Sequence, residues 1–165
     1  MAMQKNNDVA GLSAYAEKLL GPNPDDPEML NLLANAFAED PKNTQLTKAG
    51  AYARKAIELT KDDATKVTAT GFSHMVLGYV LLKEEKTPAG IEELKTATTM
   101  LSEDPADLAI AYYRLGYAHA KMKQYTEARA ALNEAMKIPG PVQPIAKTLL
   151  DQVNAAGSKA APKRR

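Results

Sequence analysis

The sequence predicts an all-α fold, in which antiparallel helix pairs stack into an α-solenoid of about eight helices. A small residue directly after a leucine recurs about every 40 residues, with apolar residues one helical turn to either side. Each copy continues into a second segment whose small residues lie about two turns apart. Repetition at this spacing, with two helical segments per unit, is typical of an α-solenoid. The three copies contain Leu33 and Ala34, Leu77 and Gly78, and Leu115 and Gly116.

Capping residues, prolines and apolar spacing predict the helix boundaries along the chain. Asp26-Pro27, Thr87-Pro88 and Asp104-Pro105 each pair an N-cap residue with a proline at the first helical position. Pro41 and the Pro-Gly-Pro run at residues 139–141 stop the helices before them. The expected helices are 8–20, 27–38, one from Asn43 or Thr44 to 60, 66–85, 87–101, 104–122, 125–138 and 142–156.

These helices predict one folded domain over residues 8–156. It comprises an N-terminal helix or half repeat (8–26), repeats at 27–61, 66–104 and 105–140, and a helix at 141–156. That last helix has Ile145, Leu149, Leu150 and Val153 on one face, so we expect it to cap the open end of the solenoid. A groove-filling or dimerising helix is the alternative. Residues 1–7 and the basic tail 157–165 are expected to be disordered.

Composition and charge suit a packed helical domain and exclude several classes of function. The 165 residues are 45% hydrophobic but only 5% aromatic, as in Ala- and Leu-rich helix packing. The formal charge is +1, and Lys159, Lys163, Arg164 and Arg165 leave −3 for the rest, so nucleic acid is not an expected partner. The absence of cysteine excludes disulfides and thiol chemistry. The most apolar run of the sequence, 75–82, is far too short to span a membrane, and no signal peptide is expected. The compartment stays open.

The last copy resembles a tetratricopeptide repeat, a family whose first helix reads aromatic-x2-Leu-Gly-x2-Tyr and whose second reads Ala-x3-Phe with a later Ala. His119 stands where the family has tyrosine. In the upstream copies His74 replaces the aromatic residue, Gly90 the first alanine and Ala34 the glycine. The resemblance covers about residues 27–140 and implies a right-handed superhelix of three repeats. The residues that fit in the last copy are Tyr112, Leu115, Gly116, Ala128, Leu132 and Ala135.

Small residues at matching positions predict close helix packing inside each repeat. Gly116 and Gly78 offer notches that let the facing Ala128 and Gly90 approach. A glycine inside a helix costs about 0.5–1 kcal/mol relative to alanine, so two glycines at equivalent positions indicate a packing requirement.

The resemblance also implies a concave groove, lined by the first helix of each repeat, as the ligand site. Carried over by position, the last repeat contributes Ile110, Tyr113, Arg114, Tyr117, Ala120 and Lys121. The middle repeat contributes Phe72, Met75, Tyr79, Leu82 and Lys83, and the first Glu28, Asn31, Asn35, Ala38 and Glu39. The groove is expected to be apolar and aromatic in its C-terminal half and polar or acidic at the other end.

Two alternatives qualify this groove. An aromatic stripe at helical spacing is more often core than binding site, and a one-residue error in register would exchange the core residues and the groove residues.

Some family members bind a C-terminal carboxylate through Lys, Asn and Arg side chains. Only Asn35 and Arg114 match that pattern, while Asn31, Val76 and Ile110 occupy the other three positions, so no such clamp is expected.

Nothing in the sequence predicts an enzyme, a metal site or a cofactor. The two histidines, His74 and His119, occupy motif positions that hold packing aromatics, so both are expected in the core, and neither has a carboxylate three or four residues away. The paired carboxylates Glu84-Glu85 and Glu92-Glu93 are expected on solvated faces. No cysteine nucleophile, metal-ligand cluster or phosphate-binding loop is present.

The sequence therefore predicts a protein–protein interaction scaffold that binds a peptide or partner segment in its groove. An extended or helical segment with apolar anchors and a basic end is expected, because tyrosines supply flat faces while Glu28 and Glu39 supply negative charge. The alternative is a structural solenoid that self-associates, as a homodimer for example, or acts as an assembly spacer without an exchangeable ligand.

Overall fold

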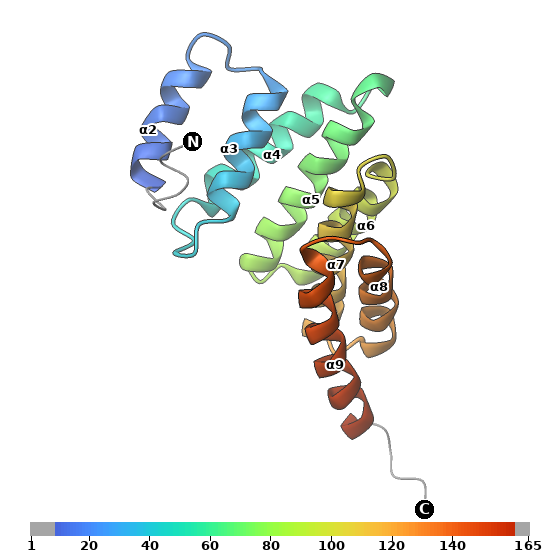
Figure 1. Cartoon of the computed structure of the whole chain (residues 1–165). Coiled ribbons are helices and arrows are strands. Elements are labelled where there is room, and N and C mark those ends of the chain that lie inside the picture. The colour runs from blue at the N-terminus through green and yellow to red at the C-terminus, as the bar shows by residue number, and fades with distance from the viewer. Residues whose placement is uncertain (1–8, 161–165) are drawn as a thin grey trace, which may run out of the picture.

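The computed structural model describes residues 9–160, and this part of the chain contains eight α-helices, one short 3-10 helix and no strand (Figure 1). The predictions for residues 1–8 and 161–165 lie outside the described residues. The helices run in chain order from α2 at one end to α9 at the other. They are α2 (Val9–Leu20), α3 (Pro27–Ala38), α4 (Leu46–Thr60), η1 (Ala64–Lys66), α5 (Val67–Lys83), α6 (Thr87–Met100), α7 (Pro105–Lys121), α8 (Tyr125–Lys137) and α9 (Val142–Ala160).

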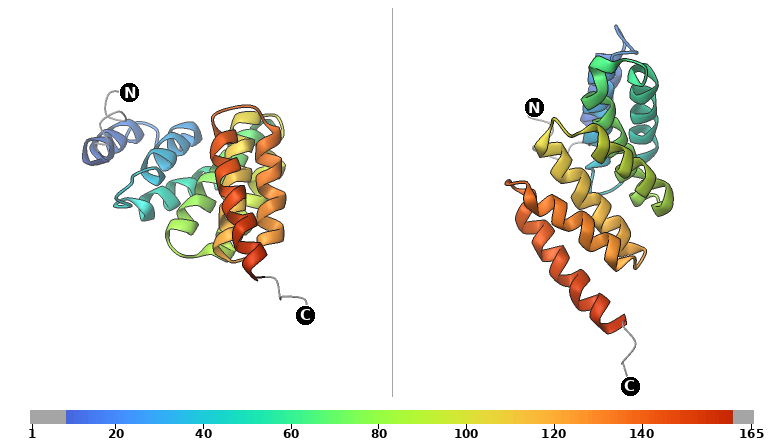
Figure 2. Two further views of the ribbon diagram at one scale, coloured as in Figure 1. Left: turned by 60° about the horizontal axis from the view of Figure 1, so that its bottom comes forward. Right: turned by 90° about the vertical axis from the view of Figure 1, so that its right-hand side faces the viewer.

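The helices form three antiparallel pairs, α3/α4, α5/α6 and α7/α8, flanked by α2 and α9. The first helices of the pairs also contact each other, α3 with α5 and α5 with α7, and so build an inner layer. α9 packs against α8 and α7 and closes the C-terminal end, as both views in Figure 2 show. The all-α solenoid predicted from the repeats is therefore confirmed.

Two helices begin at the caps that the sequence predicts. The Asp26 carboxylate accepts hydrogen bonds from the main-chain N–H groups of Glu28 (3.0 Å) and Met29 (3.1 Å), with Pro27 at the first helical position. Asp104 caps α7 in the same way. These carboxylates satisfy N–H groups that have no partner inside the helix, and they also face the positive end of the helix dipole.

The predicted cap at Thr87 is wrong. Thr87 is buried and already lies inside α6, whose N-cap is Lys86 without a side-chain bond. α4 begins at Leu46, later than Asn43 or Thr44, because Asp40 folds the preceding segment into a turn. Its carboxylate accepts from the main chain of Lys42 (3.1 Å) and Thr44 (2.9 Å). The bond from the Thr44 backbone is the main reason that the pKa of Asp40 is lowered.

The glycine notches exist where the sequence places them. A Cβ at Gly78 would lie 2.7 Å from Leu94 Cγ and 3.1 Å from the Gly90 carbonyl oxygen. A Cβ at Gly116 would lie 2.6 Å from Leu132 Cγ and 3.3 Å from the Ala128 carbonyl oxygen. Both distances to leucine are shorter than atoms tolerate, so the two helices of each pair approach as closely as they do only because these side chains are absent.

The first helices of the second and third repeats end in the same turn. Glu85 and Lys123 adopt the left-handed conformation, with φ of 63° and 59°. The next residue in each case closes the end of the helix: Lys86 N donates to Leu81 O and Gln124 N to His119 O, both at 2.9 Å. This is the Schellman arrangement, in which glycine is the usual left-handed residue.

α9 differs from the predicted cap in two respects. It continues to Ala160, so the predicted tail begins too early: residues 157–160 are helical. It packs through Val142, Ala146 and Val153, whereas Ile145, expected on the packed face, is 48% exposed. Lys147, Asp151, Gln152 and Asn154 are exposed as expected.

We predict that Gly116→Val destabilises the protein by about 2–3 kcal/mol, because overpacking a closely packed interface costs energy in this range. Urea unfolding followed by circular dichroism measures the effect. Ala130→Val, at an exposed position of α8, is the matched control and should change stability by less than about 1 kcal/mol. Equal effects of the two substitutions would contradict the notch.

Lys123→Gly should raise the free energy of unfolding by about 0.5–1 kcal/mol. A non-glycine residue in the left-handed region costs about 1–2 kcal/mol, which outweighs the greater flexibility of glycine in the unfolded chain. Lys95→Gly, at an exposed site inside α6, is the control and should lower stability by about 1 kcal/mol. The same unfolding titration checks both signs.

Candidate functional site

One open cavity on the inner layer, called here the concave pocket, collects most of the predicted groove residues. It lies between α5 and α7, the segment after α3 and the start of α9, and its volume is about 620 Å³. That volume lies within the range of about 300–1,000 Å³ that is typical of ligand-binding pockets. Nine of the sixteen predicted groove residues line it: Glu39, Tyr79, Leu82, Lys83, Ile110, Tyr113, Arg114, Tyr117 and Lys121.

The other predicted groove residues lie elsewhere. Phe72 and Asn31 line a second hollow near the first turns of α3, α5 and α7, together with Glu28 and Asp107. Asn31 is buried there, donating to Ala69 O (3.2 Å) and accepting from the Ser73 hydroxyl (2.6 Å). Its groove-facing assignment is therefore corrected to a structural one.

Met75 and Ala38 are also corrected, because both are buried in the hydrophobic core. Met75 packs between the second and third repeats and has no surface to offer a ligand. Asn35 is half-buried on α3 and is not among the residues that line the concave pocket or the second hollow. Ala120 is partly buried against the third hydrophobic cluster and is not among the residues that line the concave pocket.

An ion pair between a buried arginine and a half-exposed glutamate forms the floor of the concave pocket. The Arg114 guanidinium, 11% exposed, pairs with the Glu39 carboxylate and so joins α7 to the end of α3, two repeats away. Its Cζ lies 4.0 Å from the centre of the Tyr79 ring. Burial lowers the pKa of Arg114, and Glu39 opposes that shift. Nη1 of Arg114 is buried without a hydrogen-bond partner in the described residues.

The Lys83 side chain extends to the C-terminal end of α3, the first helix of the preceding repeat. Its ammonium group donates to the main-chain oxygens of Ala38 and Asp40, the latter at 3.3 Å. It also lies 4.6 Å from the centre of the Tyr79 ring. A cation at the C-terminal end of α3 is favourable because the helix dipole is negative there. Burial lowers the pKa of Lys83, since removing the ammonium from water disfavours its charge.

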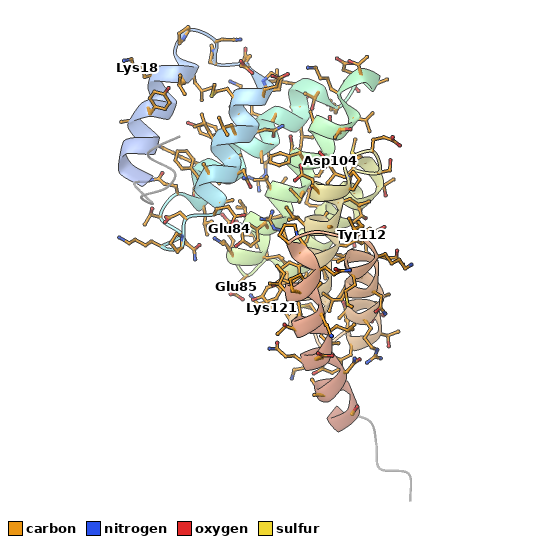
Figure 3. All side chains as sticks on the ribbon, viewed as in Figure 1. Lys18, Glu84, Glu85, Asp104, Tyr112 and Lys121 are labelled. Atoms are coloured by element: carbon orange, nitrogen blue, oxygen red, sulfur yellow. The ribbon has the colours of Figure 1, made fainter. Side chains whose placement is uncertain are left out.

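Lys121 occupies the equivalent position one repeat later. It pairs with Glu85 at 2.9 Å and lies 3.5 Å from Leu82 O, near the end of α5. Figure 3 shows Glu85 and Lys121 side by side at these ends of α5 and α7. Both lysines follow a tyrosine by four residues, so each Tyr–Lys pair shares one helix face. The pattern Tyr79-x3-Lys83 therefore repeats as Tyr117-x3-Lys121.

Five further residues line the concave pocket that sequence reasoning did not assign to it. Two are polar and come from loops, one is the proline directly before α9, and two come from the first turns of α9. The apolar contribution of α9 explains the exposure of Ile145, which faces the pocket instead of the core. The spacing of Val142, Ala146 and Val153 was the available signal, since it defines a buried stripe that omits Ile145. The five residues are Asn43, Glu85, Pro141, Val142 and Ile145.

The histidines differ from each other. His119 is buried and its Nδ1 lies 2.7 Å from Gln124 Oε1, as expected for a core residue. His74 is only half-buried, and its Nδ1 lies 2.6 Å from a carboxylate oxygen of Glu93 on α6. The core assignment of His74 and the solvated assignment of Glu93 are therefore corrected, because the partner helix supplies a carboxylate that spacing along one helix does not reveal. Among the described residues, no three His, Asp or Glu side chains cluster as a metal site would require.

The inner layer, the repeated helix pairs and the concave pocket define a helical-repeat scaffold. Residues 109–140 match the family model described as the tetratricopeptide repeat. The crystal structure of MamA is similar over 96% of this chain and 90% of that chain, with a TM-score of 0.65 and 20% sequence identity, which shows a common fold. No curated protein sequence matches the chain significantly.

The third repeat is thus a tetratricopeptide repeat, and the chain as a whole shares the helical-repeat fold of MamA. Proteins of this kind are protein–protein interaction scaffolds and are generally not enzymes. Protein partners are accordingly the class that the family assignment supports. Within residues 9–160, no helix is both long and apolar enough to cross a lipid bilayer.

We predict that Glu39→Ala lowers the free energy of unfolding by about 2 kcal/mol, because it leaves the Arg114 charge buried and unpaired. Replacing both residues, Glu39→Ala with Arg114→Met, should restore most of the loss, since methionine needs no partner. Glu134→Ala, which breaks an exposed pair with Lys137, is the control and should change stability by less than about 0.5 kcal/mol. A double-mutant cycle in urea measures the coupling; additive effects would contradict a linked pair.

Proposed function

We propose that this protein binds a segment of a protein partner in the concave pocket, and that the walls of the pocket provide the apolar contact. The observation that carries the proposal is that two exposed large side chains line one cavity. Tyr117 on α7 is 45% exposed and Ile145 on α9 is 48% exposed, and both line the pocket. Exposed apolar side chains gathered in a hollow favour an interaction site, whereas scattered ones need no explanation.

The fixed floor beneath these residues supports the same proposal. Tyr79 is half-buried between Arg114 and Lys83, and burial raises the pKa of its phenol, with Glu39 adding to the effect. These contacts hold the floor in place before a ligand arrives. A preformed site loses less conformational entropy on binding, which improves affinity. Tyr79 therefore organises the pocket, while Tyr117 and Ile145 offer contact area.

Catalysis is not part of this proposal. His119 packs against Gln124, and His74 pairs with Glu93 away from the residues that line the pocket. The proposed partner contacts are instead those of a tyrosine face and aliphatic side chains, which serve as anchors in protein interfaces.

The rival is a solenoid that buries the same wall against a second copy of itself. Sedimentation equilibrium between micromolar and millimolar protein distinguishes the two. A monomer over this range leaves the pocket open for a partner. A stable dimer that Tyr117→Ala converts to monomer would overturn the proposal, because the pocket would then be an interface between copies.

We predict that Tyr117→Ala with Ile145→Ala leaves the fold intact and lowers partner affinity at least about tenfold, as expected when two interface anchors are removed. Both residues are exposed, so the melting temperature should stay close to that of the wild type. Capture of partners from the native lysate, followed by titration of the purified partner, measures affinity. Leu59→Ala, which is 43% exposed on α4, is the control. Unfolding of the double variant would place these side chains in the core instead.

A further inference from the structure

The charge of the concave pocket has the opposite sign to that of most of the chain. Three basic side chains line it, Lys83, Arg114 and Lys121, against two carboxylates, Glu39 and Glu85. The whole chain has a formal charge of +1, and the four basic residues of its last seven positions leave −3 for the remainder. A hollow with net positive charge in an otherwise slightly acidic protein favours an acidic ligand.

The three cations are not equally available to a ligand. Arg114 is held by Glu39 and the Tyr79 ring. Lys83 forms no direct ion pair with a carboxylate in the described residues: its hydrogen-bond partners are neutral main-chain oxygens, and Glu39 and Asp40 act on its charge only from a greater distance. The Glu85 side chain paired with Lys121 is 78% exposed, so that pair is weak and can be exchanged. Lys83 and Lys121 are therefore the cations that a ligand carboxylate can reach.

These two lysines stand beside apolar surface in a repeated arrangement. The Tyr–Lys pairs of α5 and α7 present an aromatic ring and an ammonium group one helical turn apart, at equivalent positions of adjacent repeats. Tyr117 of the third repeat and Ile145 of α9 are exposed, and both line the pocket. A ligand that fills this wall brings its neighbouring side chains toward the lysines. A carboxylate there gains charge-assisted hydrogen bonds in a partly desolvated site.

Building on the proposed function, we infer that the concave pocket selects an acidic partner segment, in which an aliphatic or aromatic side chain packs between Tyr117 and Ile145 and adjacent Asp or Glu side chains pair with Lys83 and Lys121. This reverses the basic end expected from the sequence, because Glu39 is neutralised by Arg114. It also differs from recognition of a chain terminus, since internal carboxylates satisfy the two lysines equally well.

The test uses three pools of fluorescein-labelled 12-residue peptides with amidated C-termini. In every pool Leu, Phe and Tyr alternate with polar residues, which are Asp and Glu in the first pool, Lys and Arg in the second, and Asn and Gln in the third. Fluorescence anisotropy at low and high salt measures binding to the full chain. The acidic pool is expected to bind at least about tenfold more tightly than the other two and to weaken as salt rises.

Charge reversal locates the effect. Lys83→Glu with Lys121→Glu should abolish the preference for the acidic pool. The matched control, Lys95→Glu with Lys137→Glu, reverses two exposed lysines outside the pocket and should leave affinity within about twofold of the wild type. Lys121→Glu alone keeps the test valid if loss of Lys83 disturbs the end of α3, and it should weaken binding of the acidic pool about threefold or more.

The outcomes separate this inference from the proposed function. If the neutral or basic pool binds as tightly as the acidic one, and Tyr117→Ala abolishes that binding, the acidic preference is overturned while the pocket stays a partner site. Unchanged affinity for the acidic pool after both lysine reversals also overturns the inference. If no pool binds, or if Tyr117→Ala leaves the affinity unchanged, both the inference and the proposed function are overturned.

Discussion

The close approach of the two helices inside each repeat is the constraint on which the rest of the structure depends. Gly78 and Gly90 bring the backbones of α5 and α6 almost into contact, and Gly116 does the same for α7 against Ala128. Successive residues in a helix are rotated by about 100°. Because the glycine faces the partner helix, the next residue, Tyr79 or Tyr117, is directed away from it toward the inner layer. The packing notch thus fixes the aromatic face of the groove.

Contacts between repeats lie on the inner layer, away from the glycine notches, and determine how the helix pairs stack. Lys83 reaches the last carbonyl of α3, and Lys121 lies near the carbonyl of Leu82 at the end of α5. The same motif position therefore links each first helix to the one before it. Arg114 adds a longer connection, to Glu39 two repeats back. A cation that stabilises a neighbouring helix end keeps its charge, so these structural contacts also give the inner layer a positive potential.

The features that the sequence predicts well are local ones. Asp26 and Asp104 cap their helices through residues two and three positions away, and the glycine notches follow from the repeat register. The misses involve residues brought together only by folding. His74 meets Glu93 from another helix, and Arg114 meets Glu39 across 75 residues. The prediction for Ile145 is wrong because the periodicity of α9 admits two apolar stripes, and the positions of α7 and α8 decide which one is buried.

The different roles of Tyr79 and Tyr117 follow from these contacts. Arg114 and Lys83 lie against the Tyr79 ring, so these two side chains already cover part of the ring surface. Tyr117 occupies the same motif position but has no following repeat to supply an arginine. Its place next to α9 gives it Val142 and Ile145 as neighbours in the pocket. The end of a solenoid breaks the symmetry of its repeats, and here that break leaves Tyr117 exposed in a hollow beside Lys121, whose ion pair with Glu85 is exposed to solvent. The C-terminal end of the groove is therefore where recognition has both apolar area and charge available.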